Sequence, residues 1–142
     1  MIVAVAAMAA TVIGAGHAEQ TADRKAVERA VLDYVEAIYE VKPELVDRSV
    51  HRELAKRGYM RGEDGTYREA PMTFAQLRTL AERWNSQGRV DAKTARKEVV
   101  VLDLLDQTAS AKLTASWGTD YMHLAKYNGE WKIVNILWQT PK

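Results

Sequence analysis

The first amphipathic segment of the chain spans residues 21–40. Its apolar positions follow the 3.6-residue period of a helix and are Val27, Ala30, Val31, Tyr34, Val35 and Ile38. This spacing gathers them on one face, and charged residues fill the other. Pro43 ends the pattern and favours the first turn of a short second helix over 44–50.

Residues 51–69 follow neither a helical nor a strand period. The segment contains three glycines, Gly58, Gly62 and Gly65. We expect a turn at 63–65 between short extended pieces near Tyr59 and Tyr67.

A third helix is expected after Thr73. Thr73 and Gln76 have the spacing of a capping box, in which each side chain bonds to the backbone of the other. Gly88 is a natural end for this helix. Its inner face would hold Phe74, Leu77, Leu80, Ala81 and Trp84.

After Ala95 the hydrophobic period shortens to that of strands, which alternate between two faces. The pair Asn128-Gly129 favours a two-residue hairpin turn. The strands are expected at 99–105, 109–117, 121–127 and 131–138. The helices come first along the chain and the antiparallel meander comes last. This order predicts an α+β fold, with the helices packed on one face of the sheet.

Side-chain alternation assigns faces within the last two strands. Tyr121, His123 and Ala125 share one face of their strand, opposite Asp120, Met122 and Leu124. On the last strand we expect Asn135 to share a face with Ile133 and Leu137, opposite Val134, Ile136 and Trp138. Both faces of the sheet are therefore partly apolar, which indicates that both are covered.

The segment 1–18 differs from the rest because it contains no Lys, Arg, Asp or Glu. Its apolar run ends in Gly16-His17-Ala18, whose small residues suit cleavage after Ala18 by signal peptidase. We expect a signal peptide over 1–18 and a folded domain over 19–142, located in the periplasm or secreted. Retention of the segment as an uncleaved anchor is the alternative.

Composition limits the classes of function. The chain has 142 residues, 20 basic and 19 acidic residues, and no cysteine. This is the size of one domain, and its near-neutral charge predicts no partner among nucleic acids and, after signal removal, no membrane. Disulfides, thiolate metal sites and a cysteine nucleophile are excluded. Neither a glycine-rich phosphate loop nor a His-Glu-x-x-His zinc motif occurs, so no metal or cofactor is expected.

Several stretches resemble a known family. They are residues 32–39 (LDYVEAIY), 65–69 (GTYRE), 72–74 (MTF), 116–124 (SWGTDYMHL) and 130–135 (EWKIVN). Together with the order of elements, they resemble the exported bacterial branch called putative lumazine-binding, within the nuclear transport factor 2-like superfamily with its cystatin-like cone fold. The resemblance covers about residues 20–140.

The resemblance implies a cone-shaped arrangement of elements, α-α-β-β-α-β-β-β-β, with a pocket between the helices and a curved sheet. It also implies a homodimer formed through the sheet. The superfamily includes steroid isomerases, dehydratases, polyketide cyclases and non-enzymatic binding modules, so the fold does not select the activity.

Three residues are candidates for proton transfer. His123 is a candidate general base or acid in such a pocket. Asp120 is a neighbouring candidate, although alternation places it on the opposite face of its strand. His51 follows the second helix, close to the pocket mouth that the resemblance implies. Each histidine also has a purely structural interpretation, as a sheet or dimer contact for His123 and as a solvated helix-end residue for His51.

Aromatic and amide side chains are the candidates for ligand contacts. Tyr34 points into the cone if its helix neighbours do, and its hydroxyl could bond to a ligand carbonyl. The candidate ligand-binding residues are Tyr34, Tyr59, Trp84, Trp117, Tyr121 and Asn135. The tryptophans could equally be core residues. A basic cluster, His51, Arg52, Lys56, Arg57 and Arg61, is expected to form a solvated surface or a rim for an anionic ligand.

We therefore expect an exported protein that binds a small flat aromatic or apolar molecule. One alternative is a proton-transfer enzyme of the isomerase, dehydratase or cyclase type. It would use His123, His51 or Asp120 as base and Tyr34 or Tyr59 as polarising donor. A further alternative is a dimeric protein-interaction module.

Overall fold

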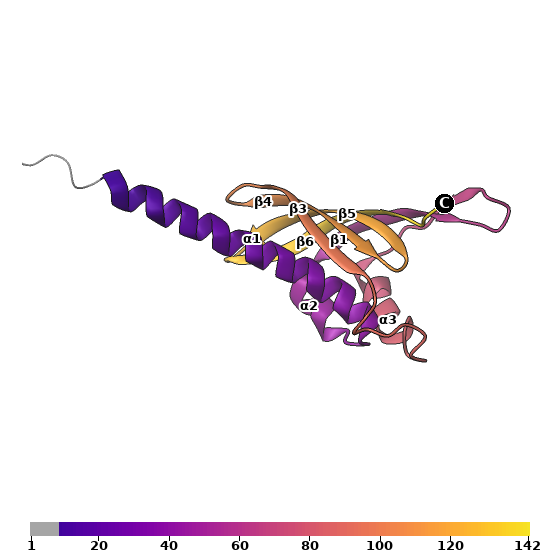
Figure 1. Cartoon of the computed structure of the whole chain (residues 1–142). Coiled ribbons are helices and arrows are strands. Elements are labelled where there is room, and N and C mark those ends of the chain that lie inside the picture. Colours follow the sequence, from indigo (N-terminus) through magenta and orange to yellow (C-terminus); the bar gives the residue numbers. More distant parts are fainter. Residues whose placement is uncertain (1–8) are drawn as a thin grey trace, which may run out of the picture.

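The computed structural model describes residues 9–142 of the chain, with side chains from residue 16 onward, and is shown in Figure 1. Residues 1–8, the first part of the expected signal peptide, lie outside the described residues. The described part contains three helices, α1 (Ala9–Tyr39), α2 (Glu44–Ser49) and α3 (Phe74–Arg83). Its strands are β1 (Val50–Arg61), β2 (Tyr67–Glu69), β3 (Lys97–Leu104), β4 (Thr108–Ala115), β5 (Gly118–Tyr127) and β6 (Glu130–Gln139).

The strands form one curved sheet in the order β2-β1-β6-β5-β4-β3. The helices lie on one face of this sheet, and the N-terminal part of α1 extends beyond its edge (Figure 1). Apolar side chains from α1, α3 and the inner face of the sheet form the core, among them Val31, Val35, Leu77, Met122 and Ile136. The expected α+β fold and its order of elements are confirmed.

The helix α1 begins earlier than the expected start near residue 21. It runs without a break through Ala18, the expected cleavage point. Its buried face begins at Val27 and continues with the predicted positions to Ile38. Cleavage after Ala18 stays a prediction. In the part of the chain that the structure describes, no helix combines the length and apolar character that crossing a membrane requires.

The meander from β3 to β6 forms as predicted, with each strand antiparallel to the next. The hairpin between β5 and β6 turns at Asn128 and Gly129, whose φ angles are 50° and 82°. Two successive positive φ angles are what a type I′ turn requires, and the pair Asn-Gly adopts them at low cost.

The prediction for residues 51–69 was wrong in one respect. Instead of a short extended piece near Tyr59, the chain forms the twelve-residue strand β1. The strand pairs antiparallel with β2 and parallel with β6, where Lys56 lies opposite Ile136. Its inward positions include Leu54, Lys56 and Gly58, so its apolar alternation is weak and the segment resembles a loop in sequence.

The third helix keeps its predicted capping box but ends at Arg83, before the expected stop at Gly88. Asn85 explains the early end. Its buried side chain donates to the carbonyls of Tyr39 and Val90, at 2.7 and 2.8 Å, and accepts from the Val90 amide at 2.9 Å. These bonds fasten the chain after α3 to the end of α1 in place of another helical turn.

The expected alternation along the last strand holds for Asn135 and Leu137, opposite Ile136 and Trp138, but was wrong for Ile133. The pairing of β5 with β6 shifts register between His123 and Leu124, where Asn135 and Ile133 are the partners and Val134 is the extra residue. This bulge puts Ile133 on the inner face with Ile136, while Asn135 and Leu137 face outward. An extra residue on one strand reverses the faces of all positions before it.

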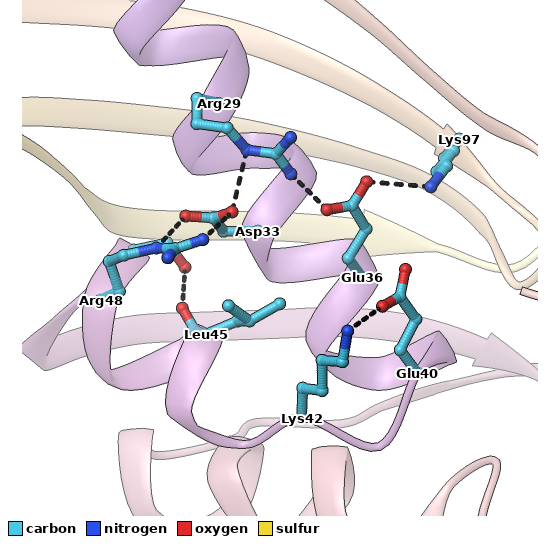
Figure 2. Close-up of polar contacts among 9 residues, drawn as sticks. Arg29, Asp33, Glu36, Glu40, Lys42, Leu45, Arg48 and Lys97 are labelled. Carbon is cyan, nitrogen blue, oxygen red and sulfur yellow. Dashed lines mark hydrogen bonds and ion pairs between the residues drawn. The ribbon is translucent and has the colours of Figure 1, made fainter.

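The outer side of α1 is tied to α2 and the sheet by an ion network, shown in Figure 2. The carboxylate of Asp33 accepts from Arg29 Nε at 2.9 Å and from Nε and Nη2 of Arg48, both at 2.7 Å. Glu36 pairs with Arg29 and, at 2.9 Å, with Lys97 Nζ. The network therefore joins α2 and β3 to the outer side of α1.

Candidate functional site

A pocket of about 260 Å³ lies between the helices and the inner face of the sheet. Residues from α1, α3, β1, β6 and the turn between β4 and β5 line it, together with the segment after β2. The lining residues are Tyr34, Ile38, Lys56, Met60, Ala70, Met72, Leu80, Trp84, Trp117 and Trp138. Most of these side chains are apolar, as in small-molecule sites generally.

Three tryptophans form much of the wall. The rings of Trp84 and Trp117 meet edge to face with centroids 5.6 Å apart, and Trp117 also meets the ring of Tyr34 at 6.1 Å. Trp138 closes the opposite side, packed over the backbone of Gly58 on β1. A Cβ at Gly58 would lie 2.2 Å from Trp138 Nε1, so only glycine permits this approach.

One charged side chain, that of Lys56, is among the mostly apolar side chains that line the pocket. Lys56 lies on the inner face of β1 and is 7% exposed. Its Nζ donates to the Tyr34 hydroxyl at 2.6 Å and lies 5.4 Å from the centre of the Trp138 ring. Burial lowers the pKa of the Lys56 amine to about 8, against the opposing effect of the negative charge on Asp120.

Two further polar groups accompany Lys56. Tyr34 is fully buried, and burial together with the charge of Asp120 raises the pKa of its hydroxyl well above 10. Asp120 on β5 is also fully buried, and burial raises the pKa of its carboxyl. Its Oδ2 accepts from Trp117 Nε1 at 3.0 Å, whereas Oδ1 has no hydrogen-bond partner among the described residues. An amine and a phenol therefore line an apolar pocket, with a buried carboxyl close behind them.

Such a set can act in two ways. It can orient a ligand through hydrogen bonds, and it can move a proton, because the Lys56 amine exchanges protons close to neutral pH. The walls supply ring faces and edges for an aromatic ligand.

The structure places four of the sequence candidates at this site. Tyr34, Trp84 and Trp117 line the pocket, and Asp120 lies behind Trp117, held by its indole nitrogen. The functional roles of these four residues stay predictions, but the structure brings their side chains together in one place.

Three other candidates, His123, Asn135 and Tyr121, lie on the outer face of the sheet, away from this pocket. His123 Nδ1 lies 3.2 Å from the amide oxygen of Asn135, and the Asn135 amide nitrogen donates to the carbonyl of Ala55 at 3.0 Å. Tyr121 is 51% exposed on the same face as His123. The expectation that Asp120 and His123 face opposite sides is confirmed, because one is buried and the other is exposed.

The remaining two candidates are also outside the pocket. His51 stacks on the ring of Tyr127 with centroids 4.5 Å apart. Tyr59 is 43% exposed and alternates with the inward Lys56 and Gly58 on β1. Neither side chain is among those that line the pocket.

Sequence reasoning missed Lys56, which was assigned to a basic cluster expected on the surface. Arg52, Arg57 and Arg61 are exposed, but Lys56 is not. The alternation in sequence is weak, because Ala55 lies between Leu54 and Lys56. Once β1 is recognised as a strand, its period of two puts Lys56 on the inner face with Leu54 and Gly58.

Comparison with known proteins adds to this geometry. A family model described as "Putative lumazine-binding" matches residues 22–139. No curated protein sequence matches the chain.

Solved structures share its fold at low identity. A protein of unknown function from Methylobacillus flagellatus, described as NTF2-like, is 19% identical with a TM-score of 0.64, over 84% of this chain and 93% of that one. A similar protein from Silicibacter pomeroyi is 16% identical with a TM-score of 0.64, over 85% and 98%. A putative scytalone dehydratase from Novosphingobium aromaticivorans is 13% identical with a TM-score of 0.58, over 89% of each chain.

Proposed function

The chain belongs to the putative lumazine-binding family of nuclear transport factor 2-like proteins, and we propose that it binds a small flat aromatic molecule in the pocket between its helices and its sheet. The observation that carries the proposal is the pocket wall, in which Trp84, Trp117 and Trp138 surround a space with one polar end at Lys56.

The size and lining of the pocket suit such a ligand. Its volume of about 260 Å³ is slightly below the roughly 300 Å³ at which typical ligand sites begin, so it suits only a small molecule. A ligand of one or two fused rings could contact the indoles, with a polar substituent directed at Lys56 and Tyr34. Aromatic contacts add about 0.5–1.5 kcal/mol each beyond the burial of apolar area.

A calorimetric titration tests the proposal. Lumazine is the first ligand to use, because the family description names it and it has two flat fused rings. Binding should weaken about tenfold in Trp84→Leu, which removes one wall of the pocket. Trp131→Leu is the matched control, since Trp131 lies outside the pocket lining and bonds to Asp23. A wide panel of aromatic metabolites without a binder would contradict the proposal.

A second candidate function is proton transfer on a bound substrate. The observation that favours it is that Lys56 and Tyr34 line the pocket with Asp120 close by. Asp120 and Tyr34 are among the groups expected from the sequence, and Lys56 takes the place of the histidines. Deuterium exchange at a carbon next to a ketone, followed by NMR in deuterated water, tests it. The exchange should disappear in Lys56→Met. Exchange that persists in this variant would show that a group other than Lys56 transfers the proton.

We also propose that the protein forms a homodimer through the outer face of the sheet. Three apolar or aromatic side chains are exposed on that face, with exposed fractions of 52% for Val100, 51% for Tyr121 and 43% for Leu137. Tyr121 and Leu137 are partners on the neighbouring strands β5 and β6, and Val100 lies on β3, beyond β4. Burial of these side chains by a second copy would remove apolar surface from water. Light scattering at micromolar concentration should give the mass of a dimer, and a monomer would contradict this proposal and the interaction-module alternative together.

Export to the periplasm with cleavage after Ala18 is likewise a proposal. It is supported by the uncharged segment 1–18 and its small residues before the expected cut. N-terminal sequencing of the protein recovered from the periplasm should begin at Glu19. A mature chain that begins at Met1 would contradict cleavage.

A further inference from the structure

Lys56 is set apart from ordinary lysines by its surroundings. It projects from the inner face of β1 into the apolar pocket, between Leu54 and Gly58, and is 7% exposed. Its Nζ lies 2.6 Å from the Tyr34 hydroxyl and over the rings of Tyr34 and Trp138, at 5.2 and 5.4 Å from their centres. The amine is therefore at the wall of a space that a small molecule can enter.

We propose that the Lys56 amine forms an imine with an aldehyde or ketone group of the molecule that occupies the pocket. The inference rests on the proposed binding function and narrows its ligand to carbonyl compounds. A desolvated lysine in an apolar pocket is the form in which this side chain acts as a nucleophile toward carbonyls.

The reaction balances without an oxidant or a reductant. The Nζ lone pair attacks the carbonyl carbon, a C–N bond forms, and the nitrogen loses a proton while the oxygen gains one. The resulting carbinolamine then loses its oxygen as water when the C–O bond breaks and C=N forms. One amine and one carbonyl group give one imine and one water molecule.

Tyr34 is placed to handle the protons. Its hydroxyl is hydrogen-bonded to the attacking nitrogen and stays protonated, because burial raises its pKa well above 10. It can donate a proton to the departing oxygen and recover one from the nitrogen. A protonated imine would carry a positive charge in place of the ammonium, and Asp120 supplies a negative charge nearby when ionised.

Burial of Lys56 also raises the fraction of its amine that is neutral, which is the form that attacks a carbonyl carbon. With a pKa of about 8, about a tenth of the Lys56 amine is neutral at pH 7, against roughly one part in 3,000 for an exposed lysine. The groups that face this amine are Tyr34 from α1 and Asp120 from β5.

Reductive trapping tests the inference. The protein is treated at pH 7 with 2-naphthaldehyde and sodium cyanoborohydride, which reduces an imine to a stable amine, and peptides are mapped by mass spectrometry. The neutral fractions differ by roughly 300-fold, so the adduct should form at least about tenfold faster on Lys56 than on any exposed lysine. Lys56→Met should lose this adduct, whereas Lys93→Met, the same change at an exposed lysine, should keep it.

A second measurement separates this inference from the binding function. Naphthalene-2-methanol has the same rings without a carbonyl and is titrated by calorimetry. If it binds and Lys56 is not labelled in the wild-type protein, the imine is wrong and pocket binding stands. If naphthalene-2-methanol does not bind and Lys56 is not labelled, the imine and pocket binding are both contradicted for a naphthalene ring. Labelling is mapped in the wild-type protein, so the inference stays testable even if Lys56→Met does not fold.

Discussion

The amine of Lys56 donates a hydrogen bond to the hydroxyl of Tyr34 at 2.6 Å, and so joins a strand to the first helix inside the pocket. Both side chains are buried, and each changes the chemistry of the other. The bond keeps the lysine at the pocket wall, where it faces the aromatic rings and the charge of Asp120. The first two predictions concern this pair.

Tyr34→Phe removes the acceptor of the Lys56 amine and leaves a buried donor without its partner. We expect a loss of about 1–3 kcal/mol in the free energy of unfolding, measured with urea at pH 7. Tyr121→Phe makes the same change at a tyrosine that is 51% exposed, and its effect should be close to zero. Equal effects of the two substitutions would contradict the structural role of the buried pair.

The stability of the protein should depend on pH through Lys56. Its pKa is lowered from 10.5 to about 8 by burial, so between these values the unfolded chain binds one more proton than the folded chain. The free energy of unfolding therefore rises with pH across this window. Tyr34 and Asp120 are the groups that face the amine and contribute to the profile.

The measurement compares the wild-type protein with Lys56→Met by urea unfolding from pH 7 to pH 10.5. The wild type should gain about 2–3 kcal/mol relative to the variant across this range. A difference between the two proteins that stays constant with pH would show that the amine is not desolvated in the folded state.

Gly58→Ala should damage the pocket directly. The added Cβ would lie 2.2 Å from Trp138 Nε1, so the indole must leave its place over β1. We expect a loss of more than about 1 kcal/mol in the free energy of unfolding and weaker ligand binding. In Gly62→Ala, the nearest atom is the end of the flexible Asp64 side chain, at 2.8 Å, so the effect should be much smaller.

Asp33→Asn should loosen the junction between α1 and α2. The buried carboxylate accepts from Arg29 and Arg48, and hydrogen bonds to charged groups contribute about 1.5–3 kcal/mol. A loss of that size is expected in urea unfolding. Glu40→Gln, which breaks the more exposed pair with Lys42, should cost less than about 1 kcal/mol. A larger effect for Glu40→Gln would contradict this ranking.

Most of the fold could be predicted because its signals are local. The stripe from Val27 to Ile38, the capping box at Thr73 and the Asn128-Gly129 turn each act within a few residues. The strand β1 gives a weaker signal, since its parallel partner β6 lies about 80 residues away and its inward positions include a lysine and a glycine. The bulge at Val134 depends on the pairing of β5 with β6, and alternation along one strand does not reveal it.

The site could be predicted only in part for a related reason. Tyr34, Trp84 and Trp117 were found because aromatic residues on predicted inner faces are natural pocket walls. Lys56 was missed because a lysine among arginines is usually solvated, and its burial follows from the packing of Trp138 and Tyr34 around it. His123 has a suitable side chain but lies on the outer face, where it contacts Asn135.

A crystal structure of the protein soaked with lumazine tests the central claim most directly, because that claim concerns where a flat ring binds. The account predicts electron density for the ring between Trp84, Trp117 and Trp138, with a polar atom of the ligand within hydrogen-bond distance of Lys56 Nζ. A ring bound on the outer face of the sheet beside His123, with the pocket empty, would contradict it.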